Sequence, residues 1–232
     1  MKQAQDLGYK SEARRGLLFV FMAGVLWSTV GLGIRMIDEA TVWQILLYRS
    51  ISLSLFLAIV IYLRSSENLF TVVRAAGLPA CIAGLALVGA YAGGIYGIQS
   101  TSVANAMLLF ASAPFMAAIL GWIFLREKVR KATWISILFA MLGIGIMVQD
   151  KSTGSALLGN LAALGSAFGF AVFTVALRWG RSGEMLPAVF LSGIFAIFIT
   201  SSICLLSGLS FQISVNDTSI SMGMGVFQVG AG

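Results

Sequence analysis

A single arginine, Arg49, lies well inside the long apolar stretch 43–63. A charge at the centre of a membrane helix costs about 2.5–3.5 kcal/mol on insertion scales, so a charged residue at such a place often has a function. The guanidinium could attract a carboxylate. Arg49 follows Trp43 by six residues, about 9 Å along a helix. Its side chain could therefore extend to the outer interface instead, or pair with Asp38 or Glu39. The sequence leaves these roles open.

Several aromatic and polar residues lie at comparable depth in other apolar stretches. A ligand cavity needs apolar walls and a few convergent polar groups, and these residues would supply both if they face the interior of a bundle. Each could equally be an ordinary packing residue, and Tyr96 could belong to an interfacial aromatic belt. The predicted cavity residues are Trp27, Ser28, Arg49, Tyr91, Tyr96, Asn105, Ser112, Pro114 and Phe168.

Pro114 lies in the middle of the apolar stretch 103–125. Proline has no backbone N–H, so in a continuous helix the carbonyl of Phe110 would lose its partner at mid-membrane. The freed acceptor could serve a hinge or contact a solute. A tolerated kink is the alternative, because proline is more common in membrane helices than in soluble ones.

Two stretches carry small residues four positions apart. This spacing places small side chains on one helix face, where they let neighbouring helices approach closely. We expect both faces to be packing surfaces, and in a moving bundle they could also permit sliding. The residues are Gly89, Gly93 and Gly97 in one stretch and Ala113, Ala117 and Gly121 in the other.

The sequence has no histidine. A His-based metal site and a Ser-His dyad are therefore excluded, and we predict no catalytic residues, no metal and no cofactor. In addition, no Asp or Glu lies deep within an apolar stretch, so proton coupling through a buried carboxylate has no obvious residue. Glu127 lies at the end of a stretch, where we expect it to pair with nearby basic residues such as Arg126 and Lys128.

The elements that position these residues follow from composition. Hydrophobic residues make up 59% of the chain and charged residues 10%, against roughly 25% charged in a soluble domain. Stretches of about 20 apolar residues fit membrane-spanning helices, and their continuous apolarity argues against barrel strands. We predict an all-α polytopic membrane protein with helices at 16–36, 43–63, 77–98, 103–125, 132–149, 157–179 and 187–207, and an eighth that begins near Ile220.

The basic residues fall on alternate loops. With a cytoplasmic N-terminus, 2 basic residues (Arg35 and Lys151) lie outside and 12 lie inside, and this asymmetry predicts that orientation in an inner (plasma) membrane. No loop carries a long basic run with interleaved aromatics, so a nucleic-acid partner is not expected. The inside residues are Lys2, Lys10, Arg14, Arg15, Arg64, Arg74, Arg126, Lys128, Arg130, Lys131, Arg178 and Arg181.

A weak internal repeat accompanies the helices. A shift of 143 residues places Gly16 on Gly159 and Arg35 on Arg178. Five helices separate the copies, so the second copy would cross the membrane in the reverse sense, as in an inverted repeat. We predict a cytoplasmic leader (1–15), a first five-helix repeat (16–149) and an incomplete second repeat (157–232), and therefore expect a truncated chain.

The region from the fourth to the fifth stretch resembles the drug/metabolite transporter superfamily, in particular its EamA-type carriers. The resemblance lies in the small-residue run TSVANAMLLFASAP at 101–114, in Arg126 and Glu127 after 125, and in Gly143 and Gly145. It implies ten helices in two inverted five-helix repeats. It also implies transport of small organic metabolites, often amino acids or related compounds, usually outward.

We therefore expect a secondary carrier of neutral or zwitterionic solutes that works by alternating access around a mid-membrane site. The expected partners are a small-molecule substrate and the lipid bilayer, and the sequence leaves a homodimer open. The alternatives are a non-transporting membrane subunit or scaffold, an inactive truncated carrier, and an enzyme acting on lipid-linked substrates. A seven-helix receptor is disfavoured, because 187–207 contains no lysine and the N-terminus is expected inside.

Overall fold

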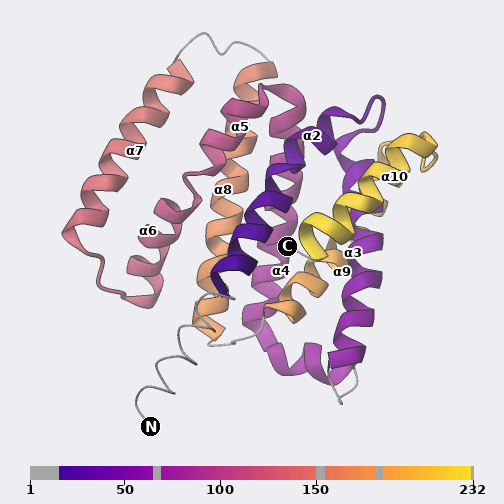
Figure 1. Ribbon diagram of the computed structural model, residues 1–232, viewed down its shortest axis with the longest axis horizontal. Coiled ribbons are helices and arrows are strands. Elements are labelled where there is room, and N and C mark those ends of the chain that lie inside the picture. Colours follow the sequence, from indigo (N-terminus) through magenta and orange to yellow (C-terminus); the bar gives the residue numbers. More distant parts are fainter. Residues whose placement is uncertain (1–15, 65–68, 150–154, 181–184, 231–232) are drawn as a thin grey trace.

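The computed structural model describes residues 16–64, 69–149, 155–180 and 185–230, and most of these residues lie in helices (Figure 1). The predicted leader 1–15 lies outside them. The elements are a first helix spanning Gly16–Arg35 that includes α2 (Val30–Arg35), α3 (Val42–Arg64), α4 (Leu69–Ser100), α5 (Val103–Phe110), α6 (Ala113–Leu125), α7 (Lys131–Gln149), α8 (Ser155–Gly180), α9 (Leu186–Leu206), α10 (Val215–Met224) and the π-helix η1 (Gly225–Gly230).

Six helical spans of the described residues are long and apolar enough to cross a membrane. They are the first helix, α3, α4, α5 together with α6, α8, and α9. The apolar helix Lys131–Ile146, within α7, is shorter. The prediction of an all-α polytopic membrane protein is confirmed.

The third span departs from its predicted bounds of 77–98. α4 begins eight residues earlier, at Leu69, and Gly77 interrupts it with φ +65° and ψ −163°. Glycine tolerates this left-handed φ because it has no Cβ. Pro79 lies two residues after Gly77, so the first turn after the break contains a residue that suits the start of a helix. The apolar pattern of the sequence predicted only the part of α4 that follows the break. The part before the break has fewer apolar residues around it in the sequence.

The fourth span is two helices rather than one kinked helix. α5 ends at Phe110, and α6 begins at Ala113 after a turn in which the Ser112 hydroxyl donates to the Leu109 carbonyl at 2.6 Å. Pro114 therefore lies in the first turn of α6. Backbone N–H groups in the first turn have no partner within the helix, so the proline removes no hydrogen bond there. The proline permits the break two residues upstream and does not distort a continuous helix.

α4 and α8 pack alongside each other at the centre of the molecule (Figure 1). Gly93 of α4 approaches α8 so closely that a Cβ atom there would lie 2.6 Å from the Ala162 carbonyl oxygen. The Ser166 hydroxyl of α8 donates to the Ala90 carbonyl of α4 at 2.6 Å. Without a hydrophobic driving force between helices in lipid, such backbone approach and interhelical hydrogen bonding hold the pair together.

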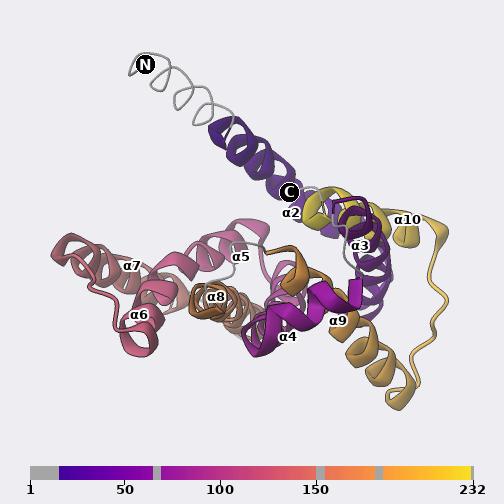
Figure 2. The same ribbon diagram turned by 90° about the horizontal axis from the view of Figure 1, so that it is seen from below.

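The other helices flank this pair. α6 and α7 lie on one side of α8, while α3, α9 and α10 lie on the opposite side of α4 (Figure 1). The N-terminal part of the first helix extends away from the other helices (Figure 2), and its most apolar window is 11% buried. Its C-terminal part, α2, joins the bundle through the buried residues Gly31 and Ile34.

The predicted small-residue faces are used unevenly. Gly97 packs on Gly159 and Ala163 of α8, as Gly93 packs on Ala162, whereas a Cβ at Gly89 would meet nothing within 4 Å. On α6, Ala113, Ala117 and Gly121 are all buried. Ala117 belongs to a small apolar cluster with two α8 residues, Ala171 and Val175.

A fully buried carboxylate ties the loop after α2 to the start of α10. Asp217 accepts backbone N–H bonds from Asp38 (3.3 Å), Glu39 (3.3 Å) and Ala40 (3.1 Å), while its own N–H donates to the N-cap Ser214 at 3.0 Å. A carboxylate in the first turn also suits the helix dipole. α10 therefore begins at Val215 and not, as predicted, near Ile220. Its start is defined by capping, and a hydropathy pattern does not detect capping.

Replacing Gly93 with alanine should destabilise the bundle by roughly 1–3 kcal/mol, because the added methyl group overlaps the α8 backbone. Thermal unfolding in detergent measures the effect. Gly89→Ala is the matched control, with the same substitution on the same helix in open space. Equal loss of stability in both variants would contradict the packing described here.

Replacing Asp217 with alanine should lower the free energy of unfolding by about 1.5–3 kcal/mol, the usual contribution of a hydrogen bond to a charged group. It should also accelerate hydrogen exchange at the amides of residues 38–40, which lose their acceptor. The control is Asn216→Ala, at an exposed neighbour whose contact with the Met36 carbonyl is 3.5 Å long. Unchanged exchange at these amides in Asp217→Ala would rule out the anchoring role.

Candidate functional site

A cavity of about 80 Å³ lies between the first helix, α3, α4, α5, α8 and η1. Its walls are mostly apolar, and a few polar groups converge on it, as is typical of small-molecule sites. The lining residues are Trp27, Val30, Ile34, Arg49, Ala90, Tyr91, Gly94, Ile95, Ile98, Ala106, Met107, Phe110, Ala163, Ser166, Phe170 and Gln228.

Three aromatic rings from three different spans form one wall. Trp27 stacks on Phe110 with centroids 6.2 Å apart and meets Phe170 edge-on at 5.9 Å, and Phe110 lies 5.6 Å from Phe170. Such distances are those of favourable aromatic pairs. The three rings therefore hold the first helix, α5 and α8 together where the cavity forms.

Arg49 forms the charged part of the site. It is 5% exposed, and its guanidinium carbon lies 4.4 Å above the ring centre of Tyr91, a cation–π contact. Among the described residues Arg49 has no carboxylate partner, and its buried Nε has no hydrogen-bond partner. The side chain extends neither to the interface nor to Asp38 or Glu39.

Gln228 of η1 adds a second polar group to the cavity. It is 5% exposed, its Nε2 donates to Thr29 Oγ1 at 3.0 Å, and its Oε1 has no partner among the described residues. The η1 segment lies close to α3, because a Cβ at Gly225 would stand 2.3 Å from the Arg49 carbonyl oxygen. The glycine therefore lets η1 approach the helix that carries Arg49.

The backbone is irregular on several sides of this cavity. The first helix is interrupted at Thr29, whose hydroxyl donates to the Leu26 carbonyl at 2.6 Å, and α5 ends at Phe110. A π-helix carries Gln228. Interrupted helices in membranes occur where the freed backbone lines a protein interior or cavity, and π-helical turns are frequent at functional sites.

The structure brings three of the predicted cavity residues together, namely Trp27, Arg49 and Tyr91. The others lie elsewhere. Phe168 and Tyr96 are 51% and 36% exposed, and Pro114 is also exposed. Ser28 bonds to the Val25 carbonyl of its own helix, the Asn105 N–H donates to the N-cap Ser102, and Ser112 bonds to the Leu109 carbonyl.

Sequence reasoning missed Phe110, Phe170, Ser166 and Gln228. Phe170 lies two residues after Phe168, and a step of two residues turns a helix by about 200°. The two rings therefore face opposite ways, and apolarity all round the helix gave no signal to choose between them. Gln228 is a polar residue in the apolar end of the chain, and that isolation was a usable signal.

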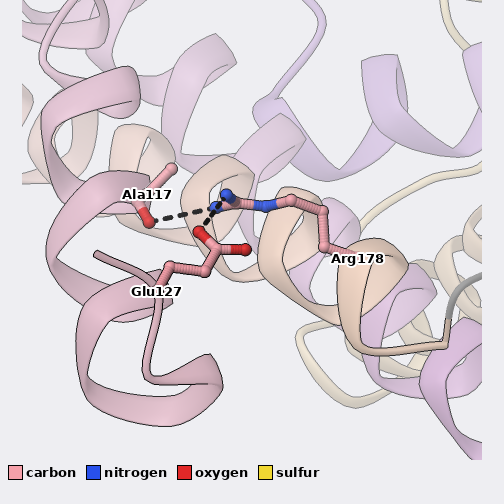
Figure 3. Close-up of polar contacts among 3 residues, drawn as sticks. All are labelled: Ala117, Glu127 and Arg178. Atoms are coloured by element: carbon pink, nitrogen blue, oxygen red, sulfur yellow. Dashed lines mark hydrogen bonds and ion pairs between the residues drawn. The ribbon is translucent and has the colours of Figure 1, made fainter. Parts of the chain in front are cut away.

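A separate polar contact links α6 to the end of α8. The Arg178 guanidinium forms an ion pair with Glu127 at 2.6 Å and donates to the Ala117 carbonyl at 3.2 Å (Figure 3). The side chains of Arg178 and Glu127 are 39% and 40% exposed. The expected pairing of Glu127 is therefore made with a distant arginine and not with the adjacent Arg126 or Lys128. Gly121 leaves room for the pair, since a Cβ there would lie 2.7 Å from Glu127 Oε2.

Comparisons with known proteins agree with this architecture. The chain is 27% identical over 199 residues to Protein RarD of Salmonella typhi, covering 82% of this chain and 65% of that one. It is 36% identical over 87 residues to Uncharacterized transporter YetK of Bacillus subtilis (strain 168), covering 35% of this chain and 26% of that one. The chain thus spans less than two thirds of these relatives.

A solved crystal structure superimposes with a TM-score of 0.64 at 17% identity, covering 92% of this chain and 74% of the other, which supports the fold. The sequence pattern of the EamA-like transporter family matches residues 14–149, more than half of the chain. These residues include the first helix, the Arg49-bearing α3 and the interrupted fourth span. The chain belongs to the EamA-like transporter family, within the drug/metabolite transporter superfamily.

Proposed function

We propose that the protein is a secondary carrier that moves small, amino-acid-like zwitterionic solutes across the membrane, normally outward. Its family and relatives indicate a membrane transporter rather than an enzyme. The observation that carries the proposal is the buried Arg49, which lines a largely apolar cavity and has no carboxylate partner among the described residues.

The chemistry of Arg49 favours a carboxylate-bearing solute. A buried charge is costly unless it is paired or hydrogen-bonded, and the Tyr91 ring offers it only partial compensation. A carboxylate in the cavity would complete that compensation with charge-assisted hydrogen bonds. The apolar wall of Trp27, Phe110 and Phe170 would accommodate the rest of the solute.

Alternating access would use the irregular segments around the site. Helices that are interrupted beside a central cavity can move as separate halves while the site stays between them. In the proposed mechanism α5 and the end of the first helix rock against α8. Small-residue contacts between α4 and α8 keep the centre closely packed.

Arg49→Gln should reduce transport of amino acids at least tenfold, because it removes the charge that would bind the carboxylate. Cells loaded with radiolabelled leucine should release it faster when they make the protein, and the variant should abolish this increase. Arg64→Gln is the control, since it makes the same change at the exposed end of the same helix. Equal release by both variants would remove Arg49 from the site. A well-inserted protein that releases no solute would favour the scaffold alternative.

We further propose a cytoplasmic N-terminus in the inner membrane. In a variant lacking Cys81 and Cys204, a membrane-impermeant thiol reagent should label Asp38→Cys in intact cells. It should label Lys128→Cys only after permeabilisation, because the excess of basic residues assigns that loop to the inside. The reverse pattern would overturn the orientation.

A further inference from the structure

The amide of Gln228 is fixed in one orientation. The Thr29 hydroxyl has a single proton and donates it to the Leu26 carbonyl, so toward Gln228 it can act only as an acceptor. The NH2 group of Gln228 must therefore face Thr29, and the amide oxygen must face the other way. The network excludes a flipped amide.

The oxygen that results is buried and unpaired. Gln228 is 5% exposed, and its Oε1 accepts no hydrogen bond from the described residues. Native proteins satisfy nearly all buried polar atoms, so an unpaired acceptor on a side chain that lines a cavity is a natural candidate to bind a ligand or water. A purely apolar cavity would not need a glutamine, and this one lies on a π-helix that packs closely against α3.

An unpaired donor borders the same cavity. Arg49 Nε lacks a hydrogen-bond partner, and the Arg49 and Gln228 side chains line one space of about 80 Å³. One small solute can therefore reach both residues. The complementary solute carries an anionic acceptor for Arg49 and, close to it, a hydrogen-bond donor for Gln228.

We propose that Gln228 is a specificity-determining residue that selects solutes with a donor beside the carboxylate, such as α-amino and α-hydroxy acids, over acids without one. This inference rests on the proposed function, since it assumes that Arg49 binds a carboxylate. The donor of the solute bonds to Oε1, while the Thr29 contact holds the amide in place.

Binding of three matched acids to the purified protein tests this selection. Leucine, 2-hydroxy-4-methylpentanoate and 4-methylpentanoate share one aliphatic group and one carboxylate and differ in the α-substituent. The two acids with a donor should bind about tenfold more tightly than 4-methylpentanoate, as expected of one hydrogen bond to a buried acceptor. Equal affinity for all three would mean that water satisfies Oε1, and the inference would fail while the proposed function stands. If none of the three binds, the proposed function itself fails.

Variants at two positions separate ligand contact from support. Gln228→Leu should lower the affinity for leucine and the hydroxy acid to that for 4-methylpentanoate, whose own affinity should change less than twofold. Thr29→Val is the comparison, because it removes the partner that orients the amide but keeps Oε1 in the protein, so it should reduce the tenfold preference less than Gln228→Leu does. Gln228→Met replaces Gln228→Leu if that variant does not fold. A preference that survives loss of the Gln228 amide would overturn the assignment.

Discussion

The buried guanidinium of Arg49 is the constraint on which the site depends. Low-polarity surroundings penalise a charge, so the structure around it must supply compensation from groups that carry no opposite charge. Tyr91 provides its ring face. No carboxylate of the described residues completes the set. Within the described residues the protein thus keeps a positive charge inside the bundle, and the buried Nε of that charge has no hydrogen-bond partner.

Close helix packing makes this arrangement possible. Gly93 and Gly97 bring α4 against α8, so that Tyr91, two residues before Gly93, lies in a firmly held part of the bundle. On the other side, Gly225 lets η1 approach the backbone of Arg49 itself. Small residues therefore act on both sides of the charge, and the aromatic contacts of Trp27, Phe110 and Phe170 close the remaining wall.

Most of the long apolar spans could be predicted to within a few residues, because hydropathy depends on composition, and the lipid requires about 20 apolar residues per crossing. The start of α4 is the exception, since it lies eight residues before the predicted one. The start of α10 could not be predicted either, since it depends on the capping of a polar segment by Ser214 and Asp217. The residues of the site were harder to predict than the helices. Arg49 and Trp27 were accessible as unusual residues, whereas Phe170 and Phe168 are chemically identical and differ only in the helix face that they occupy. That face is decided by packing against α4 and α5, which a uniformly apolar helix does not encode in its pattern.

The segment from α10 to η1 connects the loop after α2 with the cavity. At one end Asp217 accepts three N–H bonds from residues 38–40, and at the other Gln228 donates to Thr29. Between them Ser52 of α3 donates to the Met222 carbonyl at 2.8 Å. A movement that opens the cavity along η1 must break the Thr29 contact, and a larger one must also break the charge-assisted bonds of Asp217, which are the stronger set. The weaker contact lies beside the cavity and the stronger one beside the loop. The contacts therefore hold the start of α10 more firmly than the end of η1.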